Sequence, residues 1–245
     1  MNNSVLLNLE NRNKLSQSEG FKKLIPVWRD GNYDSDIKVG NINYLIKLAH
    51  EQITAETSKK IITRNEWNKF YILSGKRRTE ILKTQPKTYA IDVYHGRDSD
   101  ALYSIAETFS ADLKNYNINV PVSVCFNFVY IMIVDGGYAK YTREILTLKN
   151  FCEKQKEYTC SYADPISAFK NDIDAFIIDK KTQKVLFGVQ ILPESRATKS
   201  EKNEKLDKQS NEKFRNFKLI FGIPVRVIYS SKKGYIKNIK SINID

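Results

Sequence analysis

The chain has 245 residues, with 40 Lys and Arg against 28 Asp and Glu, which gives a formal charge of +12 at pH 7. So basic a balance predicts a polyanionic partner, most simply nucleic acid. With 41% hydrophobic and 11% aromatic residues the chain can bury one sizeable core or two small ones, which excludes a disordered basic tail protein.

Several features predict a cytoplasmic protein without a membrane span. The N-terminus has no basic segment followed by an apolar block, so no signal peptide is expected. The longest apolar run, Val122–Val134, has 13 residues, whereas a span needs roughly 20. The three cysteines show no CxxC spacing and are expected to be buried or free thiols, and with two histidines a zinc site is not expected.

The N-terminal part is predicted to be mainly helical. Apolar residues recur at helical spacing over 42–49, over 67–73 with an end near Gly75, and over 100–114. A basic cluster directly follows the second of these helices and is a candidate DNA contact: Lys76, Arg77 and Arg78. We therefore expect residues 1–118 to form a helical region that serves DNA recognition.

The run from Val120 to Val134 is dense in β-branched and aromatic residues. This composition favours a buried strand, although periodicity alone does not exclude a core helix. The Asp135-Gly136-Gly137 turn would end the strand. We accordingly assign 119–245 to an α/β core.

The C-terminal half has a clear order of elements. The patterns predict a helix, three strands, a second helix and a last strand, over 141–153, 158–163, 173–178, 185–192, 199–221 and 225–229. Pro193 ends the third strand, and Gly222 and Pro224 end the second helix.

A candidate site lies on the hairpin of the second and third strands. Gln190 and Leu192 point to one side of their strand, because residues two apart share a face, and Asp174 can sit opposite them across the hairpin. With the carbonyl group of Ile191, these side chains make an oxygen-rich pocket of the kind that suits Mg²⁺. On the residues alone, an ordinary hairpin with a capping Asp and an edge Gln competes with this interpretation.

This order and spacing resemble the PD-(D/E)XK nuclease superfamily, whose core is αβββαβ. The phrase 188–193, GVQILP, followed by FRNFKLIFGIPVRVIYSS, is similar in particular to restriction endonucleases of the MjaI type. The blocks 66–71 and 142–146 resemble that group more weakly, and the resemblance to the superfamily covers about 138–231.

The resemblance implies a Mg²⁺-dependent type II restriction endonuclease that hydrolyses double-stranded DNA. Asp174 would be the first metal ligand, Gln190 the second, Ile191 a carbonyl ligand and Glu144 a supplementary acid. Glu144 shares a helix face with Leu148 and Phe151 at i, i+4, i+7 spacing, and Asp172 is an alternative first acid. A homodimer is expected, because two-fold symmetry matches a palindromic DNA site.

One position departs from the superfamily, because Leu192 stands where its catalytic lysine is expected. Three explanations compete. The chain is an inactivated variant; another lysine, such as Lys199 or Lys184, reaches the site; or the protein is a DNA-binding protein that has lost cleavage.

The basic charge concentrates at the C-terminal end. Residues 196–245 hold 13 Lys and Arg against 5 Asp and Glu. Such a helix is often only a solvated face, yet its cations can also neutralise phosphates. The candidate DNA contacts here are Arg196, Lys199 and Lys202. The aromatic content also leaves an RNA-directed nuclease open as a weaker alternative.

Overall fold

The computed structural model describes residues 6–31, 33, 45, 48–49, 51–53, 55, 61–85, 96–163, 171–197 and 201–238, and for 201–206 it describes the backbone only. The chain forms two compact units, Met1–Lys38 with Ile62–Tyr138, and Val39–Ile61 with Ala139–Asp245. The sequence places the main boundary at 118/119, whereas the first unit runs on to Tyr138. The two units are described one at a time.

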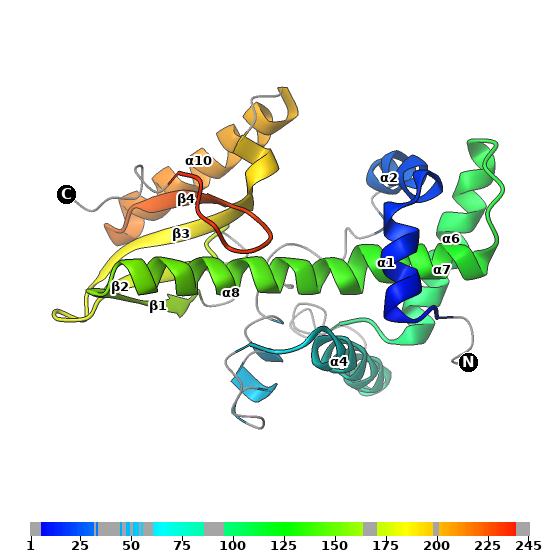
Figure 1. The fold of residues 1–245 in the computed structure, drawn as a ribbon, viewed down its shortest axis with the longest axis horizontal. Coiled ribbons are helices and arrows are strands. Elements are labelled where there is room, and N and C mark those ends of the chain that lie inside the picture. Colours follow the sequence, from blue (N-terminus) through cyan, green and yellow to red (C-terminus); the bar gives the residue numbers. More distant parts are fainter. Residues whose placement is uncertain are drawn as a thin grey trace. The chain divides into compact units, whose positions relative to one another are not determined.

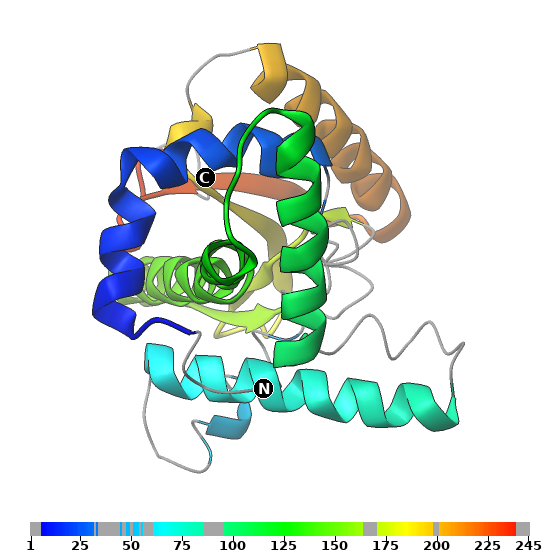
Figure 2. The same cartoon turned by 90° about the vertical axis from the view of Figure 1, so that its right-hand side faces the viewer.

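The described part of the first unit is helical (Figures 1 and 2). Its helices are α1 (Leu9–Gln17), α2 (Glu19–Gly31), α4 (Arg64–Thr84), α6 (Ser99–Asn115), α7 (Val122–Tyr130) and the π-helical turn η1 (Ile131–Asp135). Figure 2 looks along α7, with α2, α4 and α6 arranged around it. Aromatic rings fill the space between them. The ring centroid of Phe128 lies 4.5 Å from that of Phe21 and 5.0 Å from that of Phe109.

The strand predicted over Val120–Val134 is wrong, because these residues form α7 and η1. The β-branched and aromatic residues occur here because the segment is buried, and not because it is a strand. Phe128 and Val129, for example, are fully enclosed by the neighbouring helices. Pro121 precedes the first turn of α7, where a missing N–H does no harm. This helix packs on α6, which is why residues 119–138 belong to the first unit.

The helix predicted to end near Gly75 instead continues to Thr84. Gly75 is not a cap: a Cβ placed there would lie 2.1 Å from the backbone of Arg97. The glycine allows two segments to approach closely in the middle of a helix. Thr63 and Glu66 form a capping box at the helix start, and Lys76, Arg77 and Arg78 lie within the helix rather than after it.

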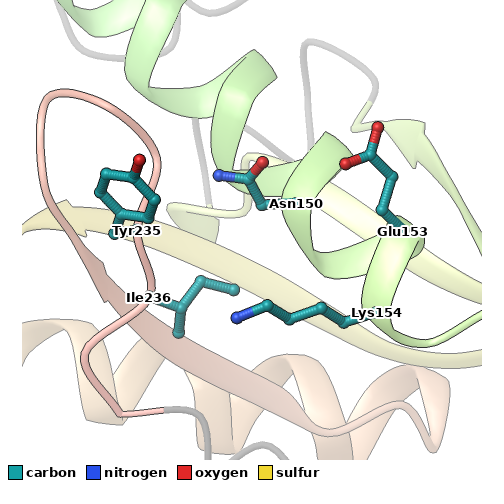
Figure 3. Close-up of a pocket in the computed structure, with 5 residues that line it drawn as sticks. All are labelled: Asn150, Glu153, Lys154, Tyr235 and Ile236. Atoms are coloured by element: carbon teal, nitrogen blue, oxygen red, sulfur yellow. The ribbon is translucent and has the colours of Figure 1, made fainter.

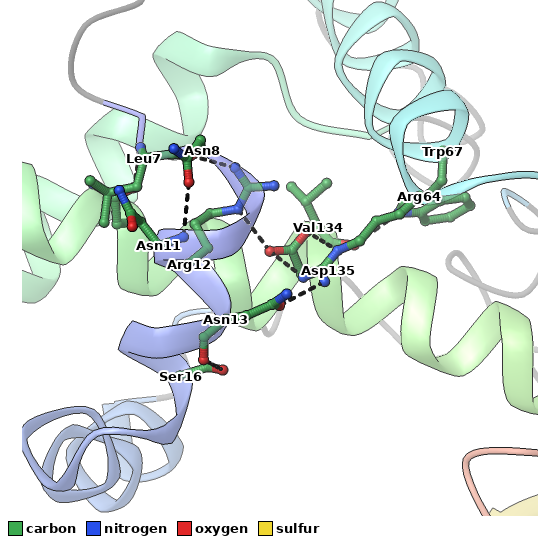
Figure 4. Close-up of polar contacts among 11 residues, drawn as sticks. Leu7, Asn8, Asn11, Arg12, Asn13, Ser16, Arg64, Trp67, Val134 and Asp135 are labelled. Carbon is green, nitrogen blue, oxygen red and sulfur yellow. Dashed lines mark hydrogen bonds and ion pairs between the residues drawn. The ribbon is translucent and has the colours of Figure 1, made fainter.

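A buried carboxylate ties three elements of the first unit together (Figure 4). Asp135, at the end of η1, lies 3.0 Å from Arg12 Nε on α1 and 2.7 Å from an Nη of Arg64 on α4. The π-helical turn also presents the carbonyl of Val134 to Trp67, whose indole N–H donates to it at 2.8 Å. Such turns leave the regular i→i−4 pattern, so their polar groups become available to neighbouring elements.

The second unit contains the predicted order of helix, three strands, helix and strand (Figure 1). Its elements are α8 (Gly136–Lys154), β1 (Tyr158–Tyr162), β2 (Ala175–Asp179), β3 (Val185–Pro193), the short 3-10 helix η2 (Glu194–Ala197), α10 (Glu201–Phe221) and β4 (Val225–Ser230). In the described residues the strands make a mixed sheet of order β1-β2-β3-β4, in which β4 alone is parallel to its neighbour β3. The predicted α/β class is confirmed.

The two helices of this unit cover opposite faces of the sheet. Leu148 and Phe151 of α8 pack on a core that includes Val189 and Ile191 of β3. On the other face, Phe217 of α10 packs with residues that include Ile173 and Val225. Gly222 has a left-handed φ of 70° and ends α10, as predicted from the sequence.

The helices α7, η1 and α8 run together over Val122–Lys154, a helical stretch of 33 residues. It is the one stretch in the described residues that is long and apolar enough to cross a membrane, although the apolar run in the sequence is shorter. Of its most apolar window, 56% is buried inside the structure. Core helices of folded domains commonly have this composition, so the feature is weak evidence for a membrane.

Candidate functional site

Asp174 lies directly before β2 and is fixed against the end of β3. Its backbone N–H donates to the carbonyl of Val189 at 2.8 Å, and its Oδ2 accepts from the N–H of Ile191 at 2.6 Å. The side chain thus takes the place of a backbone acceptor where the hairpin opens. Asp174 is buried, so this short hydrogen bond holds a carboxylate in the interior of the unit.

Glu144 is the second acid at this end of the hairpin. It continues the stripe of Leu148 and Phe151 on α8, as predicted, and its side chain is only 2% exposed. Burial and, after it, the charge of Asp174 raise its pKa to about 8, against the opposing charges of Lys140 and Arg143. Its Oε1 accepts no hydrogen bond from the residues that the structure describes. Both acids are therefore buried, and the charge of Asp174 acts on Glu144.

Three further side chains surround the pair, and the sequence did not single them out. The Nζ of Lys140 lies 3.6 Å from Glu144 Oε1, an ion pair longer than a hydrogen bond. The pKa of Arg143 is lowered by burial, although the charges of Glu144 and Asp174 act in the opposite direction. Burial and the charge of Glu144 raise the pKa of the Tyr162 phenol on β1. The signal for Lys140 was its spacing from Glu144 along one helix, at i−4, whereas the i−1 position of Arg143 gives no such signal.

Gln190 and Leu192 do not join Glu144 on the face of the sheet that α8 covers, although the strand register places Asp174 opposite Gln190. Val189 and Ile191 pack toward α8, so strand alternation turns Gln190 and Leu192 toward the face that α10 covers. The predicted split of β3 side chains between two faces is confirmed. The Gln190 Oε1 is buried and accepts no hydrogen bond from any described residue. Ile191 meets Asp174 through its N–H.

The alternative acid and the alternative lysines fall elsewhere. Asp172 does not lie on β2, because its φ of 55° is left-handed, and it pairs with Lys213 of α10 at 2.9 Å. Lys184 precedes β3 at the turn of the hairpin, the opposite end from Gln190. Lys199 lies outside the described residues.

The candidate DNA contacts fall on both units. On α4, Lys76 and Arg77 are exposed and Arg78 is half-buried. Next to α10, Arg196 forms an ion pair with Asp207 at 3.1 Å. The backbone of Lys202 belongs to α10, but its side chain lies outside the described part of the chain. Exposed cations on α4 agree with phosphate binding, as they do with ordinary solvation.

The acid pair fits a hard divalent cation. Within the residues that the structure describes, no three His, Cys, Asp or Glu side chains gather. Two carboxylates with an orphaned buried oxygen are nevertheless the donors that Mg²⁺ prefers, since it is commonly held by one or two protein carboxylates and otherwise by water and substrate phosphate. A divalent cation between them would also relieve the repulsion that raises the pKa of Glu144.

A small pocket lies at the other end of α8, where that helix meets the segment after β4 (Figure 3). Its lining residues are Asn150, Glu153, Lys154, Tyr235 and Ile236. Asn150 anchors this segment through a hydrogen bond from Nδ2 to the carbonyl of Gly234 at 3.0 Å. The pocket shares no residue with the acid pair, so the candidate site is the pair and its surrounding cations.

Comparison of the chain with protein-family models, with curated proteins and with solved structures found no match.

Proposed function

We propose that the protein is a Mg²⁺-dependent endonuclease that hydrolyses phosphodiester bonds of double-stranded DNA. The observation that carries the proposal is the buried, coupled pair of Glu144 and Asp174 at the open end of the β2–β3 hairpin. The order of elements around it, helix, three strands, helix and strand, is the order of the PD-(D/E)XK core that the sequence resembles. The charge of +12 supports an anionic substrate.

Hydrolysis joins the oxygen of a water molecule to phosphorus and breaks the bond from phosphorus to the 3′ oxygen. One proton of the water ends on the leaving oxygen, and the other stays on the new phosphate or passes to solvent. Asp174 and Glu144 would hold the metal, and the N–H of Ile191 keeps Asp174 in place for this role. Bound Mg²⁺ supplies charge stabilisation at the phosphate and lowers the pKa of the attacking water.

We further propose that the enzyme is of the restriction type and acts as a homodimer, since cutting both strands of a palindromic site needs two active sites. Phosphate contacts would come from the basic residues of α4 and α10. Exposed Lys76 and Arg77 are the α4 candidates.

A second function, DNA binding without cleavage, is favoured by one specific observation. Leu192 is not a lysine, and both it and Gln190 face away from Glu144 on the other side of β3. A protein of this kind would keep the scaffold and the basic surface but lose the chemistry.

The test compares the wild-type chain with Asp174→Asn and with the matched control Asp172→Asn. Each substitution removes one carboxylate, and the two positions are two residues apart. At position 174, asparagine can still accept the hydrogen bond from the N–H of Ile191. Asparagine also tolerates the left-handed backbone at position 172. We expect Mg²⁺-dependent nicking of a mixed-sequence plasmid by the wild type and by Asp172→Asn, and its loss in Asp174→Asn and in chelator. DNA binding without cleavage by all three would favour the second function.

A further inference from the structure

We propose that Lys140 supplies the cationic group of this site and contacts the scissile phosphate, in place of a lysine on β3. This inference rests on the proposed hydrolysis at Glu144 and Asp174, and it identifies the residue that completes that site. Leu192 stands where a catalytic lysine is expected on β3, and in this proposal the positive charge comes from α8 instead.

The geometry places Lys140 at the outer end of the acid site. Lys140, Glu144, Leu148 and Phe151 follow one stripe of α8 at i, i+4, i+8 and i+11, and the last two are buried in the core. Along this stripe exposure rises from 2% for the Glu144 side chain to 22% for that of Lys140. The Nζ atom lies 3.6 Å from Glu144 Oε1, so the ammonium group reaches Glu144 from its more exposed side.

Strand β3 cannot present a lysine to the same place from position 192. Leu192 and Gln190 face the α10 side of the sheet, whereas Glu144 belongs to α8 on the other side. A lysine at 192 would have to reach around the strand to meet Glu144. The neighbouring cation Arg143 is a poorer candidate, because its Nε is buried.

The chemistry needs such a group. Charge on the phosphoryl oxygens must be stabilised in the transition state, and an ammonium donates up to three hydrogen bonds to them. Its flexible stem lets it move from Glu144 to phosphate when a divalent cation takes over the carboxylate. Removal of one well-placed donor of this kind commonly costs about 100-fold to 1,000-fold in rate.

The experiment compares Lys140→Met, Lys140→Arg and the control Lys149→Met in the full chain. Lys149 forms the same i, i+4 pair with Glu153 on the same helix, at 3.7 Å, but with both side chains about half exposed and away from the acids. Two quantities are measured for each variant: the rate of plasmid cleavage with Mg²⁺, and the affinity for Mn²⁺ by calorimetry without DNA.

We expect Lys140→Met to cut about 100-fold more slowly than wild type. It should bind Mn²⁺ at least as tightly, because a competing cation is gone from beside Glu144. Lys140→Arg should keep cleavage within about tenfold, Lys149→Met should match the wild type, and Leu192→Lys should raise cleavage less than about threefold.

Four results would overturn the inference. The first two are that Lys140→Met cuts as fast as Lys149→Met, and that it loses Mn²⁺ binding together with cleavage, which is the signature of a structural role. A gain of more than about tenfold in Leu192→Lys would return the role to β3. A wild type that binds Mn²⁺ but does not cut would show that Lys140 does not complete the site, whereas one that does neither would overturn the proposed function itself.

Discussion

Replacing Glu144 by glutamine should change how the stability of the protein depends on pH. The pKa of Glu144 is about 8 in the folded chain, raised by burial and by the charge of Asp174, against an ordinary value of 4.5. Between these values the unfolded chain has lost the proton that the folded chain keeps, so the free energy of unfolding falls as the pH rises. The slope is about 1.4 kcal/mol per pH unit, and the full loss is at most about 5 kcal/mol.

Glutamine mimics the protonated acid and removes this loss. In metal-free buffer we therefore expect Glu144→Gln to be close to wild type near pH 5 and more stable by about 2 to 5 kcal/mol at pH 8. Urea unfolding followed by circular dichroism at pH 5, 6, 7 and 8 measures the difference. Glu153→Gln, on the exposed part of the same helix, serves as the control and should show no trend. A difference between wild type and Glu144→Gln that stays constant across this range would refute the reasoning.

Two predictions concern the stability of the first unit. Asp135→Asn leaves Arg12 and Arg64 beside a neutral side chain, and since Arg12 is buried the free energy of unfolding should fall by about 3 to 5 kcal/mol. A decrease below about 1 kcal/mol in urea unfolding would contradict a supporting role for this carboxylate. Gly75→Ala should lower the melting temperature although alanine favours helices, because its Cβ would collide with the backbone at Arg97. An unchanged or higher melting temperature would show that the two segments can separate without cost.

The element order of the second unit was predictable because each element has a local signal that agrees with its packing. The strand ending at Pro193 is rich in β-branched and apolar residues, and the glycine at 222 takes the left-handed turn that ends α10. The spacing of Glu144, Leu148 and Phe151 correctly predicted one buried face of α8. Local patterns and tertiary contacts point the same way here.

Two predictions in the first unit were wrong because burial and close approach imitate other signals. Residues 122–134 are mostly apolar and Cys125 to Tyr130 are all buried, so the run shows little of the one-sided pattern that reveals an amphipathic helix. Gly75 looks like the end of a helix, yet it is needed where α4 meets Arg97, a contact between residues more than 20 positions apart. Neither cause is visible without knowing which elements pack together.

The candidate site was predictable only in part. Strand alternation separated Gln190 from Ile191, but it did not say on which side of the sheet Glu144 would lie. The role of Lys140 was not predictable, because a Lys and a Glu four residues apart usually form a solvated surface pair, as Lys149 and Glu153 do. The burial of Glu144 distinguishes the two pairs, and burial is a property of the fold.

The most direct test of the central claim is a crystal structure of the wild-type chain soaked in Mn²⁺, with anomalous differences recorded to locate the ion. Our account predicts a peak at coordination distance from carboxylate oxygens of both Glu144 and Asp174, and its absence in Asp174→Asn. An ion bound elsewhere, or no peak between the two acids at a concentration that supports cleavage, would contradict it.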